Sequence, residues 1–435
     1  MEAKSRVRDF LSRRGMFHGD IDLAQCTEAF LGEMEDGLAG RPSSLQMIPT
    51  FIEADGEIPL GRPVVAVDAG GTHLRVAVVH FQEGGKPVLA SYRKHPMPGL
   101  CGPISSDGFF AALAHHLREL TTRADSLGLS FSFPAEILPN KDGRVVRLCK
   151  EMQVDGISGQ LLGERLNAAL GELRAGRSLR VVVLNDTVGA LLAGRAANSS
   201  RGRLAYAGFV LGTGTNCSYV ESNDKIRKRR DLKPGARQIV NVESGAYAGA
   251  PRGKIDLDFD ASTADPGKYV FEKAFSGAYL GALALRTLRE MARTGLFSPK
   301  VTARLEGHPR LETSDLDAFL GGPDTGSGLH GEFRRDGTSS DLGIACETVD
   351  LLVERAAKLA SISLGATLLR GRSAAASPEE PVCVTAEGST LYGLRSLRER
   401  LVVALESILR ARVPYRLVAV DHAPLVGAAV AGLTN

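Results

Sequence analysis

The chain lacks tryptophan altogether and has only six cysteines among its 435 residues. None of the cysteines form a CxxC pair, and the gaps between them are long. This spacing argues against a disulfide framework or a structural zinc site and indicates reduced thiols in a cytosolic protein. No run reaches about 18 uncharged apolar residues, and the charged N-terminus lacks the apolar core of a signal peptide. We therefore expect a soluble protein of the cytoplasm.

An excess of either charge is also lacking, since 53 basic and 50 acidic residues give a net charge of +3. This near balance gives no general argument for binding to nucleic acid or to a membrane. One dense basic run, residues 224–237, could recruit an anion, but a solvated hairpin or loop is the better interpretation. The composition is that of a globular protein with two or three domains, and we expect a monomer or homodimer.

A short polar turn interrupts two apolar runs in the segment VVAVDAGGTHLRVAVV. Glycines let backbone N–H groups approach an anion, so Gly70, Gly71 and Thr72 could cradle a phosphate. Asp68 suits a magnesium ion held through water, and the guanidinium fork of Arg75 suits phosphate oxygens. The alternative is a tight hairpin with a surface salt bridge. The turn is not a Walker loop, because no GKS or GKT follows it.

The same outline of strand, glycine-threonine turn and strand returns roughly 140 residues later, in YAGFVLGTGTNCSYVES. Gly212, Thr213 and Gly214 form the second turn. Two copies of one hairpin suggest two related halves that face each other. Together, the two turns could grip a nucleotide tail from both sides.

Between the hairpins, Asn185 and Asp186 end a buried strand in VVVLNDTVGALL. Ligands of α/β proteins gather at the carboxyl ends of strands. An aspartate in this place can accept a proton from a hydroxyl as that hydroxyl attacks phosphorus. The alternative is a helix N-cap, for which both residue types are favoured.

The remaining pattern predicts an alternation of strands and helices. We expect strands at 64–71, 74–81, 88–95, 129–137, 180–186, 206–222 and 381–387. Helices are predicted at 21–40, 106–124, 159–173, 187–197, 271–293, 343–371 and 422–435. Residues 311–341 are rich in glycine and polar residues, which predicts loops around short elements.

Seven segments occur in the order seen in the hexokinase family: VDAGGTHLRVAVV, LSFSFP, LNDTVGALLAG, LGTGTNCSYVE, NVESGAYAG, FEKAFSGAYLGALALR and TAEGSTLY. The chain resembles that family from about residue 22 to its end. The resemblance implies an α/β, two-domain actin-like ATPase (ribonuclease H-like) fold with a central cleft and duplicated mixed sheets flanked by helices. It implies a small domain of residues 56–190 plus about 423–435, and a large domain of residues 1–55 and 191–422.

The resemblance also assigns roles to single residues. Asp186 matches the catalytic base, and Lys150 would stabilise the charge on the transferring phosphoryl group. The matching sugar-contacting positions are Ser132, Cys149, Lys150, Asn185, Asp186, Asn216, Glu243 and Glu272. The matching nucleotide-binding positions are Asp68, Gly70, Gly71, Thr72, Arg75, Gly212, Thr213, Gly214, Gly388 and Ser389, with Asp68 and Asp186 meeting magnesium through water.

The chemistry of these residue types agrees with a sugar site. Carboxylates accept hydrogen bonds from hydroxyls, and an asparagine both donates and accepts. One departure concerns the sugar loop, which reads LCKEM where the family has tryptophan-threonine-lysine-glycine-phenylalanine. Cys149 replaces a threonine, and because a thiol is a weak donor we expect an altered sugar affinity or selectivity.

The implied function is an ATP-dependent hexokinase that transfers the γ-phosphoryl group of MgATP to the 6-hydroxyl of a hexose, glucose above all, and so feeds glycolysis. A rival is a kinase of another actin-like family that acts on N-acetylated sugars or uses another phosphoryl donor. Many bacterial relatives of that kind carry a cysteine-rich zinc motif, which this chain lacks. A second rival is a sugar sensor without useful catalysis. A cytoskeletal relative of actin would have no need of NDTVG and FEKAFSGAYLG.

Overall fold

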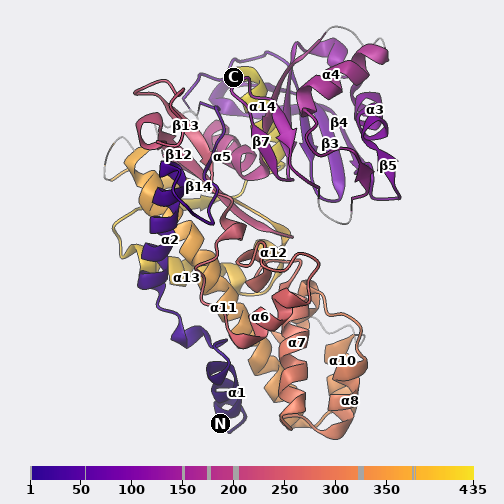
Figure 1. The fold of residues 1–435 in the computed structure, drawn as a ribbon, viewed down its shortest axis with the longest axis vertical. Helices are drawn as coiled ribbons and strands as arrows, with labels where there is room; N and C mark the ends of the chain where they lie inside the picture. The colour runs from indigo at the N-terminus through magenta and orange to yellow at the C-terminus, as the bar shows by residue number, and fades with distance from the viewer. Residues whose placement is uncertain are drawn as a thin grey trace.

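The computed structural model describes residues 2–53, 55–148, 152–173, 178–198, 205–321, 328–374, 377 and 379–435. Two of the predicted site residues, Cys149 and Lys150, lie outside the described residues. The described part contains two large sheets, one at the upper right of Figure 1 and one to its left that extends toward the middle, with a group of helices below them. Two further sheets have two strands each. The five described cysteines are all free.

The first sheet has five strands in the order β10-β6-β2-β3-β4. Strands β10, β6 and β2 are parallel, whereas β2, β3 and β4 form an antiparallel meander. Helices α3 and α4 cover one face, and α5 and α14 cover the other. These elements are β2 (Val64–Ala69), β3 (His73–Phe81), β4 (Pro87–Pro96), β6 (Ser126–Phe131), β10 (Arg180–Leu184), α3 (Ser106–Leu117), α4 (Leu162–Glu172), α5 (Asp186–Ala197) and α14 (Ala423–Thr434).

The second sheet has six strands in the order β1-β13-β12-β11-β14-β15. Read from its other edge, it repeats the first sheet: three parallel strands (β15, β14, β11) are followed by antiparallel neighbours (β12, β13). The repeat confirms the predicted duplicated mixed sheets. The strands are β1 (Ile48–Pro49), β11 (Tyr206–Leu211), β12 (Thr215–Ser222), β13 (Arg237–Asn241), β14 (Val382–Glu387) and β15 (Tyr415–Val418).

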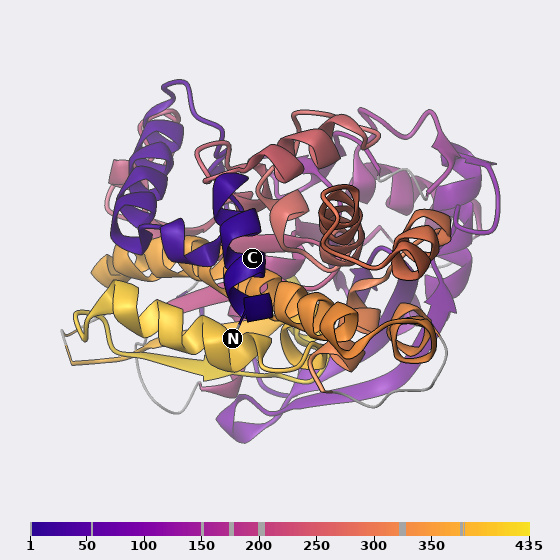
Figure 2. The ribbon, with the colours of Figure 1, turned by 90° about the horizontal axis from the view of Figure 1, so that it is seen from below.

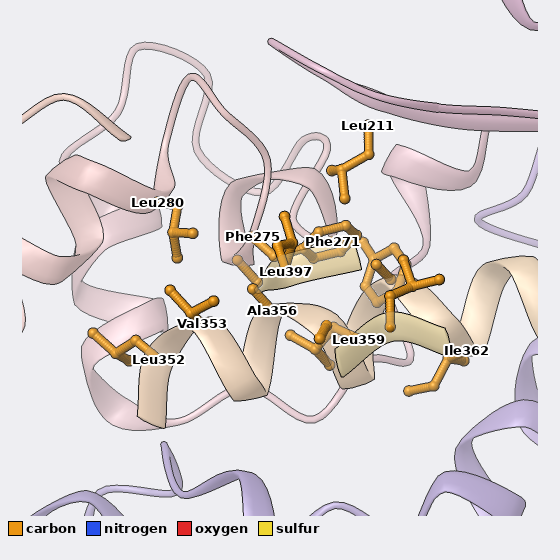
Figure 3. Packing of buried hydrophobic residues seen from close by; sticks show 14 of the residues in the cluster. Leu211, Phe271, Phe275, Leu280, Leu352, Val353, Ala356, Leu359, Ile362 and Leu397 are labelled. Atoms are coloured by element: carbon orange, nitrogen blue, oxygen red, sulfur yellow. The ribbon is translucent and has the colours of Figure 1, made fainter. Parts of the chain in front are cut away.

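Helix α11 (Ser339–Gly371) is 33 residues long and runs through the helical layer beside the second sheet. Its apolar side chains, among them Val353, Ala356 and Leu359, lie with Phe271 and Phe275 in one buried cluster (Figure 3). Figure 2 shows α13 alongside α11. The other helices are α1 (Glu2–Arg13), α2 (Leu23–Ala39), α6 (Lys254–Ala261), α7 (Leu280–Arg293), α8 (Pro299–Gly307), α9 (Leu316–Phe319), α10 (Leu329–Asp336), α12 (Ser389–Gly393) and α13 (Leu397–Leu409).

Helices α5 and α14 cross at glycines. A Cβ atom added to Gly427 would lie 1.8 Å from the carbonyl oxygen of Gly189, and one added to Gly189 would lie 3.0 Å from the Cα of Pro424. The two backbones therefore touch directly, which only glycine permits. The predicted domain boundaries stay a prediction, although α14 packs on the first sheet and β1 pairs within the second.

Two predicted elements are interrupted in the structure. The helix predicted at 271–293 begins only at Leu280, because the preceding residues form a short turn and a loop bonded to the second hairpin. The strand predicted at 129–137 ends at Phe131, before Pro134, which has no N–H to donate. Its second part is a separate strand, β7 (Ala135–Ile137), which pairs with β8 (Gly143–Val145).

Two smaller differences concern helices, and one loop agrees with its prediction. Helix α3 stops at Leu117, short of the predicted end at 124, and a separate turn follows at Thr121–Arg123. Helix α1 was not predicted. The basic run 224–237 forms mainly a loop between β12 and β13, which confirms the interpretation as a solvated loop.

Candidate active site

The first hairpin, β2–β3, brings Asp68 opposite Arg75. The Arg75 guanidinium lies 2.6 Å from an Asp68 carboxylate oxygen, and Asp68 is buried. Burial raises the pKa of Asp68, and the charge of Arg75 opposes that rise. The turn is closed by the Gly70 N–H, which donates to the carbonyl of His73, and a Cβ on Gly71 would meet open space. The hairpin thus combines the predicted salt bridge with an accessible glycine turn.

The second hairpin, β11–β12, is closed by the Gly212 N–H, which donates to the carbonyl of Gly214 at 2.9 Å. Gly388 lies against it with a φ of +127°, and a Cβ there would lie 2.1 Å from the carbonyl oxygen of Leu211. Only glycine fits this close approach. Ser389 then begins α12. The predicted nucleotide segments at 212–214 and 388–389 are therefore direct neighbours.

Asp186 lies between the hairpins, at the first position of α5 after strand β10. The preceding Asn185 caps the helix by accepting from the Thr187 N–H at 2.9 Å. Burial, followed by the negative charge of Asp68, raises the pKa of Asp186 to about 6, against hydrogen bonds from Thr187 and Ser132. The N-cap alternative therefore describes Asn185, which leaves Asp186 as a half-buried acid with a raised pKa, the kind of group that marks functional sites.

Polar side chains at the end of the second sheet form one hydrogen-bonded cluster with Asn185. The side-chain amide of Asn216 donates to the side-chain oxygens of Asn241 (2.8 Å) and Asn185 (3.3 Å). The Asn241 amide donates to Glu243 at 2.8 Å. Glu243 has a φ of 59°, a strained conformation for a residue with a side chain. Strain of this kind persists where surrounding contacts fix a functional side chain.

Glu272 approaches the same cluster from the turn before α7. Its carboxylate accepts from the Thr215 N–H at 3.0 Å, and a Cβ on Gly214 would lie 2.5 Å from it. Burial raises the pKa of Glu272 to about 7, and the charges of Glu243, Asp265 and Asp186 add to the rise. Burial also raises the pKa of Glu243, against hydrogen bonds from Asn241 and Asn216. These carboxylates gain from accepting hydrogen bonds of a polyhydroxylated ligand.

Arg147 connects the first sheet's half of the molecule with the second. Its guanidinium lies 4.7 Å from the centre of the Tyr269 ring and 3.6 Å from a carboxylate oxygen of Asp265. Asp265 also pairs at 3.1 Å with the buried ammonium of Lys273, next to Glu272. Arg147 precedes the predicted sugar loop in the sequence, so this contact holds the segment before that loop beside Tyr269 and Asp265.

Asn241, Glu387 and Arg147 were missed by sequence reasoning. Asn241 begins the segment NVESG and Glu387 stands before Gly388 in TAEGST, so both lie in segments already singled out. Burial raises the pKa of Glu387 to about 7, and the charges of Asp68 and Asp186 add to the rise. Asn241 and Glu387 could have been found from the sequence, because each lies within two residues of a predicted site residue.

A metal site in this region would rest on carboxylates at the ends of two strands. The negative charge of Asp68 raises the pKa of Asp186, and the charges of Asp68 and Asp186 both raise the pKa of Glu387. A cation among these three carboxylates would therefore be favoured. Among the described residues, no group of three or more ligand side chains encloses a metal ion. Magnesium usually keeps several waters and takes one or two carboxylates plus phosphate oxygens, so the residues present fit it.

The comparisons with known proteins agree with this geometry. Two family models, both described as Hexokinase, match residues 15–196 and 206–434. The chain belongs to the hexokinase family. Hexokinase-9 of Oryza sativa subsp. japonica is 34% identical over 71% of this chain and 63% of its own length. Hexokinase-1 of Schizosaccharomyces pombe is 24% identical over 94% of this chain and 86% of its own length.

Solved hexokinase structures share the fold. The hexokinase from Schistosoma mansoni complexed with glucose aligns with a TM-score of 0.81 at 24% identity, over 100% of this chain and 99% of that one. A second hexokinase structure has a TM-score of 0.75 at 22% identity. The two-domain actin-like ATPase fold expected for a hexokinase is thereby confirmed. Within the described residues, no helix is both long and apolar enough to cross a membrane.

Proposed function

We propose that this hexokinase transfers the γ-phosphoryl group of ATP to the 6-hydroxyl of a hexose, with glucose as the expected substrate. The observation that carries the proposal is Asp186, a half-buried acid with its pKa raised to about 6, near two glycine hairpins and an Asn–Glu cluster. A base whose pKa lies near the working pH combines the deprotonated form with a useful affinity for the proton. The chemistry is that of phosphoryl transfer, in which positioning and electrostatics dominate.

Asp186 accepts a hydrogen bond from the attacking hydroxyl and takes its proton as the bond to phosphorus forms. The N–H groups at the tips of the two hairpins, those of Gly71 and Thr213, would face the phosphates. Asp68 and Asp186 would hold magnesium through water, and Lys150 would neutralise charge on the transferring group. Bound magnesium supplies charge neutralisation between the β- and γ-phosphates.

The sugar hydroxyls are assigned to Asn185, Asn216, Glu243 and Glu272. A carboxylate accepts from two hydroxyls and an asparagine donates and accepts, so the hydroxyl groups on the sugar ring can be paired. A sugar whose hydroxyl points elsewhere leaves a buried polar group unpaired, which costs about 1–3 kcal/mol. Ser132 lies at the same edge, because its N–H donates to the carbonyl of Ala69. In this proposal the enzyme acts in the cytoplasm as a monomer or homodimer.

Initial rates across a panel of hexoses and phosphoryl donors with magnesium, with each sugar phosphate product measured directly by mass spectrometry, test the function. For glucose, an assay coupled to glucose 6-phosphate oxidation gives a continuous readout. Glucose, mannose, fructose, glucosamine and N-acetylated sugars are the acceptors, and ATP, pyrophosphate and polyphosphate are the donors. We expect the highest kcat/KM for glucose with ATP. A preference for an N-acetylated sugar or another donor would assign the chain to a different kinase activity, and sugar binding without turnover would make it a sensor.

The assignment of Asp186 is tested by Asp186→Ala. We expect sugar binding to persist while kcat falls by about 10³-fold or more, because the proton acceptor is lost. Calorimetric titration with glucose and the coupled assay measure the two effects. Activity within tenfold of the wild type would show that Asp186 is not the base.

A further inference from the structure

Helix α7 carries arginines along its outer face. Arg286, Arg289 and Arg293 follow one another at spacings of three and four residues, which places them on one stripe. The opposite wall is the segment Pro309–Leu311, which contributes Arg310. The two walls flank an open cavity of about 270 Å³, whose lining includes Phe259, Leu285 and Leu311.

The positive charge of this arginine cavity is only partly neutralised. Arg293 pairs with Glu290 and Arg310 pairs with Glu312. Arg289 donates instead to backbone carbonyls, among them that of Leu305 at 2.8 Å, which carry no net charge. Two guanidinium charges therefore remain after the two carboxylates are counted, those of Arg286 and Arg289.

Arg286 stands out among the four arginines. Its Nε is shielded from solvent and has no hydrogen-bond partner among the described residues. A buried donor left without a partner costs free energy that a bound acceptor would recover. A bound anion could accept a hydrogen bond from this Nε–H group.

We propose that the arginine cavity binds a small phosphomonoester. Such a group carries a charge of about −1.5 to −2 at pH 7, which matches the two remaining positive charges. Its oxygens accept paired hydrogen bonds from a planar guanidinium, a geometry that lysine cannot supply. The apolar lining at Phe259, Leu285 and Leu311 accommodates the carbon skeleton of the ester.

The arginine cavity is separate from the candidate active site. Helix α7 lies at the lower end of the molecule in Figure 1, with α6 and α8 beside it. The segment Pro309–Leu311 is nevertheless connected to the second hairpin through Thr313, which follows it in the sequence. The Thr313 hydroxyl donates to the carbonyl of Gly277 at 2.7 Å, and the Gly277 N–H donates to the carbonyl of Gly212 at 2.8 Å.

Isothermal titration of the full chain at pH 7.5 tests the proposal, with inorganic phosphate and phenyl phosphate as probes. Both probes should bind, phenyl phosphate more tightly because its ring covers the apolar lining. We expect Arg286→Gln to weaken both affinities by about tenfold. Arg304→Gln is the matched control, because Arg304 lies on the neighbouring α8, pairs with Asp336 at 3.0 Å and does not line the cavity. It should bind like the wild type.

The candidate active site can also take phosphate, so the difference between the two variants is decisive. If Arg286→Gln binds both probes like the wild type, or if the wild type binds neither probe, the proposal is wrong. Circular dichroism establishes that Arg286→Gln is folded. Arg310→Gln, from the opposite wall, provides a second test: it must weaken binding as well, and unchanged affinity in that variant overturns the proposal. The titration needs no turnover, so its result is independent of the proposed kinase activity.

Discussion

The carboxylate of Asp186 is governed by competing neighbours. Burial and the nearby Asp68 favour its neutral form, whereas hydrogen bonds from Thr187 and Ser132 favour the charged one. The result is an acid with a pKa of about 6, well above the usual value of 3.8. Such a group is ionised at neutral pH but remains basic enough to take a proton from an alcohol in the transition state.

This balance predicts the acid limb of the pH–rate profile. Because the base must be deprotonated, kcat/KM should be constant above about pH 7 and fall roughly tenfold per unit below pH 6. Initial rates between pH 5 and 8 at subsaturating glucose measure the profile. A limb centred near pH 4 would mean that Asp186 is not buried as described, or that another group is the base.

Glu272 predicts a stability effect of the same origin. Its pKa is raised from 4.5 to about 7 in the folded protein, so the folded state binds its proton more tightly than the unfolded state does. The associated stability is present below about pH 4.5 and is lost as the pH rises through 7. Glu272→Gln removes this loss, and its Tm should exceed that of the wild type by about 3 °C at pH 8 but not at pH 5.

Differential scanning calorimetry at the two pH values measures this effect. Glu28→Gln, an exposed position on α2, is the matched control and should leave Tm unchanged at both. An equal Tm difference at pH 5 and pH 8 for Glu272→Gln would rule out the charge of Glu272 as its cause.

Sequence reasoning reached single residues where a motif places them at the end of a strand. Asn185, Asp186 and Asn216 follow or begin apolar strands, and the structure places them within one hydrogen-bonded region. Asn241 could not be assigned in the same way, because its role depends on a pairing between β12 and β13 that the sequence does not state. The sugar loop at Cys149 and Lys150 lies outside the described residues, so its predicted departures stay predictions.

At the scale of elements, strands and helices with strong periodicity were predictable, and segments held by distant contacts were not. The helix predicted from residue 271 begins nine residues later, because the N–H groups of Gly277 and Ala278 bond to the carbonyls of Gly212 and Thr213. The spacing of apolar residues alone cannot reveal that a segment with a helical pattern instead forms hydrogen bonds with a hairpin distant in the sequence.

Arg147 contacts Tyr269 and Asp265 in the half of the molecule that contains the second sheet, and we expect this contact to affect sugar binding. Arg147→Ala removes the cation–π contact with Tyr269 and the ion pair with Asp265. Both favour the arrangement in which the two halves meet, so we expect the hexose KM to rise by about three- to tenfold with little change in kcat. Arg147→Lys should restore part of the loss, since an ammonium keeps the charge.

Arg144→Ala is the matched control for this prediction. Arg144 lies on β8, three residues before Arg147, but pairs with Glu136 on β7 at 3.5 Å, within its own half of the molecule. Steady-state kinetics with varied glucose should show the wild-type KM for this control. A similar rise in KM for both variants would mean that the hairpin's fold, and not its link to the other half, determines sugar affinity.

At the scale of the whole molecule, two sheets of like topology are joined through α5 and α14. Both helices pack in the layer shared by the two halves, in one apolar cluster with strands from each sheet. The duplicated hairpins of the sequence predicted this repeat, but not the direct contact of Gly189 with Gly427, because single glycines in a helix have many causes.

The glycine crossing predicts a large effect from a small substitution. Gly427→Ala places a methyl group 1.8 Å from the carbonyl oxygen of Gly189, which forces the helices apart and should destabilise the fold by about 1–3 kcal/mol. Chemical denaturation measures the change. Gly343→Ala, on the exposed face of α11 with open space around it, should instead stabilise by up to about 1 kcal/mol. Equal stability of both variants would show that the helices can separate freely.

The contact between α5 and α14 also lies close to Asp186. Gly189 follows Asp186 by three residues in the same helix, which is roughly 4.5 Å along its axis. If the two halves rotated about the contact between α5 and α14, loops far from that contact would move a long way. Asp186, which lies close to the contact, would move only slightly. Asp186, the proposed base, would therefore be displaced least by a relative motion of the halves of this kind.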